Sequence, residues 1–139
     1  MDVRPGTRWA AARIKALCEK HNSQCVVDGI GPGGALAAEL ERLDVRAHKV
    51  KAAELTAGCA GFFDRITRTD SEGQPCPEIK IRPSNALDYA AELATARRIG
   101  DAWAWDRRGE AGSIAPLEAA TLAMIGALDT RDPVAAIIY

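Results

Sequence analysis

The amino-acid sequence predicts an α/β domain in which short strands alternate with helices. Apolar side chains recur every three to four residues in several segments, a spacing typical of helices that pack on a core. Short apolar runs stand between these segments and are typical of buried strands. Of the 139 residues, 47% are hydrophobic and 27% are charged, an ordinary composition for a globular chain. Such alternation indicates a layered domain with a parallel or mixed sheet.

The first part of the chain is predicted to run helix, strand, helix, strand. The first helix is expected from Thr7, a candidate N-cap, to about His21, with its apolar residues on one side. The run Cys-Val-Val-Asp-Gly at 25–29 indicates a buried strand. Gly-Pro-Gly-Gly at 31–34 is expected to break the chain before a helix over 35–43 and a strand over 45–50.

The second part is predicted to be mainly helical. Helices are expected over 52–67, over 84–98 (begun by Pro83-Ser84) and over 113–128. A strand is expected over 102–106, and a short edge strand over 78–82. The segments 69–77 and 107–112 are expected to be loops. We therefore expect one domain over residues 1–128 and a C-terminal tail over residues 129–139.

Charge and hydropathy exclude several classes of protein. The net charge is −1, with +3 in residues 1–51 and −4 in residues 52–139, so neither half has the basic excess of a protein that holds DNA by charge alone. No apolar run approaches the ~20 residues of a membrane span, and the N-terminus lacks the apolar core of a signal peptide. We expect a cytoplasmic protein without a membrane partner.

The four cysteines, Cys18, Cys25, Cys59 and Cys76, form no CxxC pair and no zinc spacing with a histidine. Cys18, His21 and Cys25 follow one another at intervals of three and four residues, so a metal site is one interpretation. In a cytoplasmic chain, reduced and partly buried thiols are the better explanation.

Asp28 is the sharpest candidate for a functional residue. It is expected at the carboxyl end of a central strand, just before a glycine-rich turn, where open α/β sheets place their sites. A carboxylate there suits a hard cation such as Mg²⁺ or Mn²⁺. Alternatively, the amides of Gly31, Gly33 and Gly34 would bind a phosphate, although the pattern departs from G-x-G-x-x-G and the acid would repel the phosphate. A third interpretation is that Asp28 only caps the turn.

The second conspicuous stretch is Trp-Ala-Trp-Asp-Arg-Arg at 103–108. Trp103 and Trp105 would share one face of a strand and stack on bases, while Arg107 and Arg108 would contact phosphates. The alternative is that the tryptophan pair packs beneath a helix and that Asp106 balances one of the arginines.

Several motifs, taken in order, resemble one family. They are VVD at 26–28 with GPG at 31–33, VKAAE at 50–54, ALDYAA at 86–91, WAWDRR at 103–108, IAPL at 114–117 and AATLA at 119–123. In their order and spacing they resemble the C-terminal nuclease domain of the large terminase subunit of tailed phages, in the form common in actinobacterial phages and prophages. The resemblance covers about residues 4–128.

This resemblance implies a ribonuclease-H-like, three-layer α/β domain with a mixed sheet. It also implies an endonuclease that cuts concatemeric double-stranded DNA with two divalent ions, Mg²⁺ or Mn²⁺, held by acidic residues. Asp28 corresponds to the second catalytic acid of the family and is the first candidate for a metal ligand. The sequence contains no G-x-x-x-x-G-K-[ST] motif of the ATPase motor that precedes this domain in full terminases.

Two departures from the family pattern lower the expected activity. The chain resembles the family only from the segment after the first three strands, so the first strands of the sheet and the first catalytic acid are expected to be missing. Ser113 stands where the family usually has an Asp, and a hydroxyl is a weaker ligand for a hard cation. Glu118, one to two turns further on where the family usually has an apolar residue, is the other candidate catalytic residue.

The leading functional hypothesis is therefore a terminase-type nuclease domain that is weak or inactive alone. One alternative is a non-catalytic module that binds DNA or a partner such as another terminase subunit or the portal protein. The other is a small Rossmann-like nucleotide-binding domain that uses the glycines at 31–34.

Overall fold

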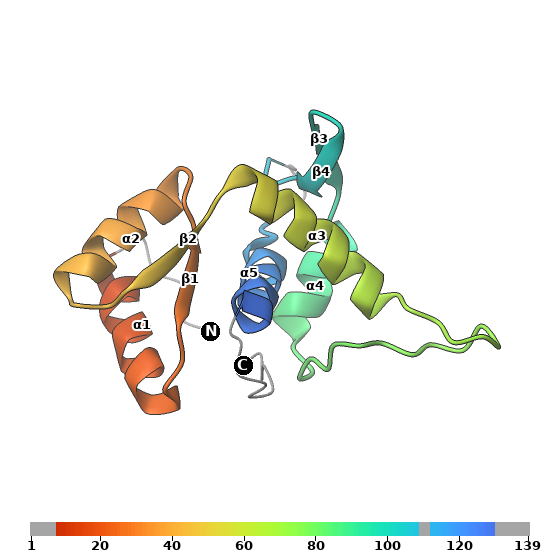
Figure 1. Cartoon of the computed structure of the whole chain (residues 1–139), viewed down its shortest axis with the longest axis horizontal. Coiled ribbons are helices and arrows are strands. Elements are labelled where there is room, and N and C mark those ends of the chain that lie inside the picture. Colours follow the sequence, from red (N-terminus) through yellow and green to blue (C-terminus); the bar gives the residue numbers. More distant parts are fainter. Residues whose placement is uncertain (1–7, 109–111, 130–139) are drawn as a thin grey trace. The chain divides into compact units, whose positions relative to one another are not determined.

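The computed structural model describes residues 8–108 and 112–129 of the chain. These residues form five helices and four strands (Figure 1), which confirms the predicted mixture of α and β structure. They belong to two compact units, residues 1–51 (the N-terminal unit) and residues 52–139 (the C-terminal unit). Each unit is described by itself. The expected tail begins at the last residue of a helix and otherwise lies outside the described residues, as does the expected cap at Thr7.

The N-terminal unit contains α1 (Arg8–His21), β1 (Cys25–Asp28), α2 (Pro32–Arg42) and β2 (Ala47–Val50). Strands β1 and β2 are parallel and pair from Cys25 with Ala47 to Asp28 with Val50. Helix α2 packs against α1 and against both strands, and Figure 1 shows the two helices on the same side of the strand pair. The centre of this core consists of Ala11, Cys25, Val27, Ala37 and Leu40.

Helix α2 begins at Pro32, earlier than the sequence predicts, so the glycine-rich segment belongs largely to the helix. Pro32 occupies the first turn, where its missing N–H costs nothing. Gly31 precedes the helix with φ +65°, which favours glycine. A Cβ at Gly33 would collide with the backbone carbonyl oxygen of Asp28. The glycines therefore allow the helix to begin directly against the end of β1.

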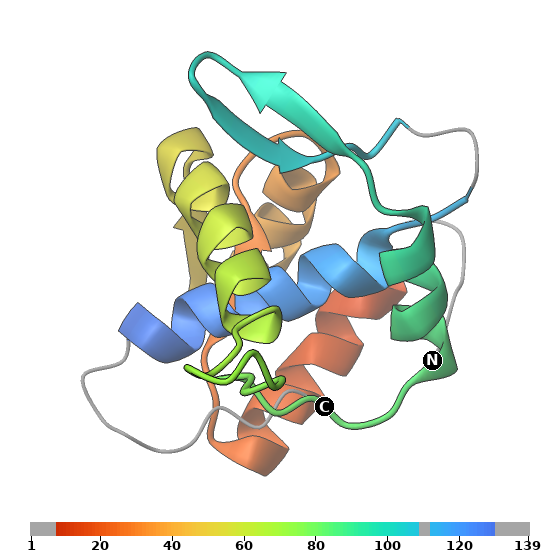
Figure 2. The ribbon, with the colours of Figure 1, turned by 90° about the vertical axis from the view of Figure 1, so that its right-hand side faces the viewer.

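The C-terminal unit contains α3 (Ala52–Ile66), α4 (Asn85–Leu93), β3 (Ala96–Ile99), β4 (Ala102–Trp105) and α5 (Ala115–Asp129). Figure 2 shows α5 crossing α3, and both α3 and α4 pack against α5. Strands β3 and β4 form an antiparallel hairpin, and β4 packs against α3. The largest buried side chains of this unit include those of Leu55, Phe62, Trp105, Leu117, Met124 and Ile125.

Helix α4 ends at Leu93, whereas the sequence predicts a helix to about residue 98. Its beginning is as predicted, because the Ser84 hydroxyl accepts the Leu87 N–H as an N-cap. Ala94 is extended, and residues 96–99 become β3. The backbone carbonyl of Thr95 accepts the N–H of Asp106 at 2.8 Å, next to the paired hairpin strands. This pairing with β4 outweighs the local helix propensity of the alanine and arginine residues.

The strands of the described residues form two separate sheets of two strands each, β1–β2 parallel and β3–β4 antiparallel, where the sequence predicts a single mixed sheet. Residues 78–82, expected as an edge strand, do not form one. Among the described residues, none of the helices combines the length and the apolarity that a membrane span requires.

A long segment, residues 67–84, connects α3 to α4 and extends away from the helices of its unit in Figure 1. Its tip is closed by Asp70, whose Oδ1 accepts the N–H groups of Glu72 and Gln74 at 2.9 Å each. Further along, the Glu78 carboxylate pairs with Arg65 and Arg68, and its N–H donates to the Arg65 carbonyl at 2.9 Å. The segment is a loop, as predicted for residues 69–77, with both its tip and its base fixed.

A side-chain hydrogen bond from Trp105 connects the hairpin to α5. The Trp105 indole Nε1–H donates to the Thr121 hydroxyl at 3.0 Å, and that hydroxyl donates to the Leu117 carbonyl at 2.9 Å. Trp105 is 9% exposed and Thr121 is fully buried. A buried indole N–H needs an acceptor, and this short chain of hydrogen bonds provides it.

Replacement of Gly33 by alanine should destabilise the protein, because the new Cβ would meet backbone that cannot rotate away. Gly34→Ala is the matched control in the same helical turn, where the Cβ would lie 3.3 Å from the Gly29 carbonyl oxygen. Alanine is otherwise the better helix former by about 1 kcal/mol. In urea unfolding, Gly33→Ala should lower the midpoint clearly while Gly34→Ala changes it little. Equal effects of both substitutions would contradict the close contact.

Thr121→Val should leave the Trp105 indole N–H without an acceptor, at a cost of about 1–3 kcal/mol in the free energy of unfolding. Hydrogen exchange of the indole N–H, followed by NMR, should accelerate in this variant. Thr121→Ser retains the hydroxyl and should retain the slow exchange. Slow exchange in the valine variant would show that the hydrogen bond is not what protects the indole.

Candidate functional site

Asp28 lies where the sequence places it, as the last residue of β1 and at the carboxyl end of the parallel pair. It is 7% exposed. Its Oδ1 accepts the N–H of Ile30 at 3.0 Å, and the N–H of Gly29 donates to the Val50 carbonyl at 3.1 Å. The carboxylate therefore caps the turn after the strand, as one interpretation predicts, and it does so at the sheet edge where α/β proteins place ligands.

The glycine-rich turn offers few amides to a phosphate. The N–H groups of Gly29 and Ile30 are used as described above, and that of Gly34 donates to the Gly31 carbonyl at 3.0 Å. Pro32 has no N–H. The Asp28 carboxylate lies at the same turn and would repel an anion. The geometry therefore does not favour the nucleotide-binding alternative.

Glu118 and Ser113, the other residues predicted to act in catalysis or metal binding, lie at the beginning of α5 in the C-terminal unit. The Glu118 carboxylate accepts a hydrogen bond from the guanidinium Nε of Arg107. The Ser113 hydroxyl accepts the N–H of Ala115 at 3.3 Å and caps the helix. Both side chains thus have structural roles in their own unit, and Asp28 belongs to the other unit.

The described residues contain no group of three or more His, Cys, Asp or Glu side chains that could hold a metal ion. The interpretation of Cys18, His21 and Cys25 as a metal site is therefore not supported. All four cysteines are free thiols, of which Cys25 and Cys59 are buried, Cys18 is half-buried and Cys76 is exposed. The prediction of reduced and partly buried thiols holds for three of them.

Burial raises the pKa of three of these thiols. It raises the pKa of Cys25 to about 11, with a smaller contribution from the neighbouring Cys18. Burial likewise raises the pKa of Cys18 and of Cys59. In Cys18 the rise in the pKa is partly opposed by interactions with the Ser23 and Cys25 side chains, which favour the thiolate. At neutral pH these groups are almost entirely protonated.

Trp105 is not available to stack on a base, because its indole is buried and hydrogen-bonded to Thr121. Trp105 thus packs against a helix, as the alternative has it, and its contact with nucleic acid stays a prediction that this burial does not favour. Trp103 is half-buried between Phe63 and Trp105, with ring centroids 6.2 Å and 4.9 Å away in edge-to-face geometry. Trp103 keeps part of its ring at the surface.

The arginines after β4 differ in their surroundings. Arg107 pairs with Glu118 rather than with Asp106. Asp106 instead accepts the backbone N–H of Arg108 at 3.0 Å, and the Arg108 residue is exposed. Both predicted phosphate contacts are exposed residues, and the Arg107 guanidinium is engaged with Glu118.

Sequence reasoning missed two exposed arginines, Arg97 and Arg98, because it placed them in a helix. In β3, Arg98 pairs directly with Trp103 across the hairpin. Gly100-Asp101 between two short runs, with φ +61° at the glycine, was a signal for this hairpin turn. Residues 95–108 contain four arginines and two aspartates, a local charge of +2 within the acidic half of the chain.

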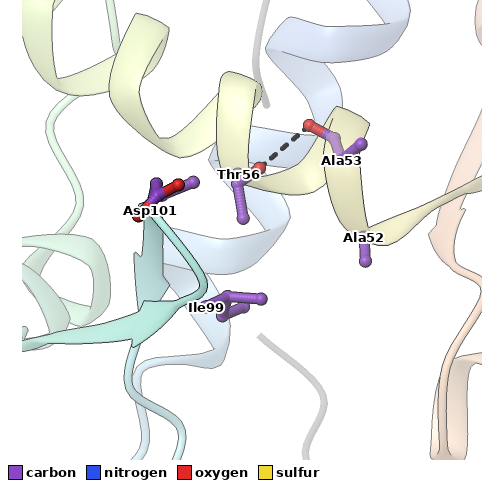
Figure 3. Close-up of a pocket in the computed structure, with 6 residues that line it drawn as sticks. Ala52, Ala53, Thr56, Ile99 and Asp101 are labelled. Carbon is purple, nitrogen blue, oxygen red and sulfur yellow. Dashed lines mark hydrogen bonds between the residues drawn. The ribbon is translucent and has the colours of Figure 1, made fainter.

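An open pocket of about 480 Å³ lies between the first turn of α3 and the hairpin turn (Figure 3). Its lining residues are Ala52, Ala53, Thr56, Ile99, Asp101 and Ala102. The Thr56 hydroxyl is already engaged with the Ala53 carbonyl at 3.0 Å. None of the predicted site residues lines this pocket, and its few polar groups do not converge on one point.

Comparison of the chain with family models, with curated proteins and with solved structures found no match.

Proposed function

We propose that the chain is a nuclease domain of the terminase large-subunit type, with a ribonuclease-H-like arrangement, and that it is weak or inactive as an endonuclease on its own. The proposal combines the motif order in the sequence with one observation. That observation is a buried carboxylate, Asp28, at the carboxyl end of β1 in a strand–helix–strand unit with parallel strands. The expected substrate is double-stranded DNA in the cytoplasm of a host cell.

The position of Asp28 supports a role in metal binding. A carboxylate held on a rigid strand end presents its oxygens with little loss of conformational entropy, as hard cations require. The turn that follows fixes the side chain through the Ile30 amide. Asp28 would thus contribute one carboxylate to a site that also needs other acids.

The donor set of the described residues does not complete a two-metal site. The Glu118 carboxylate is paired with Arg107, which offsets its charge. The Ser113 hydroxyl already serves as a cap, and a neutral oxygen is a poor replacement for a carboxylate. Together with the missing cluster of acids, this supports low activity of the isolated chain. In this proposal the further ligands come from outside the described residues, for example from another terminase subunit or the portal protein.

Asp28 should bind Mn²⁺ even though we expect the isolated chain not to cleave DNA. Titration of the ¹⁵N-labelled protein with Mn²⁺ should broaden the amide signals of Gly29 and Ile30 before other signals. Asp28→Asn should abolish this broadening while it retains the turn, because its amide oxygen can still accept the Ile30 N–H. Glu41→Gln, which removes an exposed acid of α2, is the control and should leave the effect unchanged.

The same proteins should leave supercoiled plasmid intact in Mn²⁺. Nicking by the wild type that is lost in Asp28→Asn would contradict the proposed inactivity and would strengthen the nuclease assignment. Broadening that is confined to surface acids, and that Asp28→Asn does not change, would refute the metal-binding role.

A second candidate function is non-catalytic binding of DNA, and the hairpin favours it. Arg97, Arg98 and Arg108 are exposed. The partly exposed Trp103 lies opposite Arg98. Arginine side chains can contact phosphates while an aromatic ring contacts a sugar or base. This function requires no metal and is compatible with an incomplete nuclease site.

Simultaneous Arg97→Gln and Arg98→Gln should weaken binding to a labelled DNA duplex in fluorescence anisotropy. If both side chains contact phosphates, the slope of log K against log[salt] should become shallower by about 1.8. Arg13→Gln with Lys20→Gln changes the charge equally on exposed positions of α1 and serves as the control. A similar loss in both double variants would indicate only an effect of net charge, and the hairpin would then have no special role.

A further inference from the structure

Cys18 and Cys25 are brought together by the connection between α1 and β1. Cys18 lies in the last part of α1, and Cys25 is the first residue of β1. The chain reverses between them at Asn22, which has φ +47°, and the N–H of Ser23 donates to the Cys18 carbonyl at 3.1 Å. The reversal is thus fixed by the backbone.

The two thiols interact within one packed core. Interaction with Cys18 adds to the burial that raises the pKa of Cys25, while interactions with the Ser23 and Cys25 side chains lower the pKa of Cys18 in part. Cys18 is half-buried and packs against the core of the N-terminal unit, to which the buried Cys25 belongs. One cysteine is therefore partly exposed to solvent, and the other is buried.

We propose that Cys18 and Cys25 form a redox-sensitive dithiol that closes to an intramolecular disulfide by exchange with a low-molecular-weight disulfide such as oxidised glutathione. Closure requires the sulfurs to approach to about 2.05 Å. Only six residues separate the cysteines, so closure competes well with reaction at a second chain.

The exchange proceeds in two balanced steps. The Cys18 thiolate attacks one sulfur of the glutathione disulfide, forms a mixed disulfide and releases the first glutathione as a thiolate, which takes a proton from water. Cys25 then loses its thiol proton to water and attacks the Cys18 sulfur, which releases the second glutathione in the same way. Two cysteines are oxidised, and one glutathione disulfide is reduced to two thiols.

The roles of the two cysteines follow from their surroundings. Cys18 is the more accessible residue, and interactions with the Ser23 and Cys25 side chains partly offset the rise in its pKa. Cys25 is buried and holds its proton more tightly. Cys18 is therefore the attacking residue and Cys25 the resolving one. Because both thiols are less acidic than usual, the first step is slow at neutral pH.

Tryptic mapping of the wild-type chain tests this proposal without any substitution. The native protein is incubated with oxidised glutathione, the remaining thiols are alkylated, and the protein is digested. Cleavage after Lys20 separates the two cysteines into peptides 16–20 and 21–42. We expect these two peptides to be joined, at a mass about 2 Da below their sum. Reduction before digestion should separate them.

Two variants test which cysteine attacks glutathione first and which one then resolves the mixed disulfide. Cys25→Ala should stop at the mixed disulfide, so that peptide 16–20 carries one glutathione. Cys18→Ala should leave Cys25 largely unmodified. Cys76→Ser, which removes the exposed thiol, is the matched control and should still give the joined peptides.

Two outcomes would overturn the proposal. In the first, peptides 16–20 and 21–42 remain separately alkylated while peptide 69–80, which contains Cys76, carries glutathione. In the second, the joined peptides appear only after denaturation in urea, which would show that the native contact does not lead to closure.

Discussion

The close approach of α2 to the end of β1 is the constraint on which the N-terminal unit depends. Gly33 leaves no room for a side chain above the Asp28 carbonyl, and Gly31 takes a backbone conformation that side chains disfavour. The amide of Ile30 meanwhile donates to the Asp28 side chain. The backbone and the side chain of Asp28 are thus fixed by the same short turn, and the turn holds the carboxylate in place.

The sequence predicts the elements whose signal is local. Apolar spacing locates α3 and α5 to within two residues, and a serine with the right geometry marks the beginning of α4. Strand β3 was missed because Ala96 and its neighbours favour helix locally, and only pairing with β4 in the hairpin makes them extended. The beginning of α2 was missed for a similar reason, since the glycines are required by contact with β1 rather than by a break in the chain.

The candidate site shows the same division. The position of Asp28 follows from a short apolar run that ends in an acid, which is a local pattern. The burial of Trp105 does not follow from a local pattern. Alternation in a strand shows which residues share a face, but it does not show which face a helix covers. The pairing of Arg107 with Glu118 was not predicted either, since Glu118 reaches it from the next helix, eleven residues away, while the adjacent Asp106 binds backbone.

The loop between α3 and α4 has a practical consequence for work on this protein. Its tip is closed by Asp70, and Glu78 anchors its base to α3. Gly73 has nothing within 4 Å of the position that a Cβ would take. Insertions are best tolerated at exposed tips whose ends are held together. The tip is therefore a natural point for a fluorophore, an affinity tag or a surface tether, well separated in the sequence from both Asp28 and the hairpin.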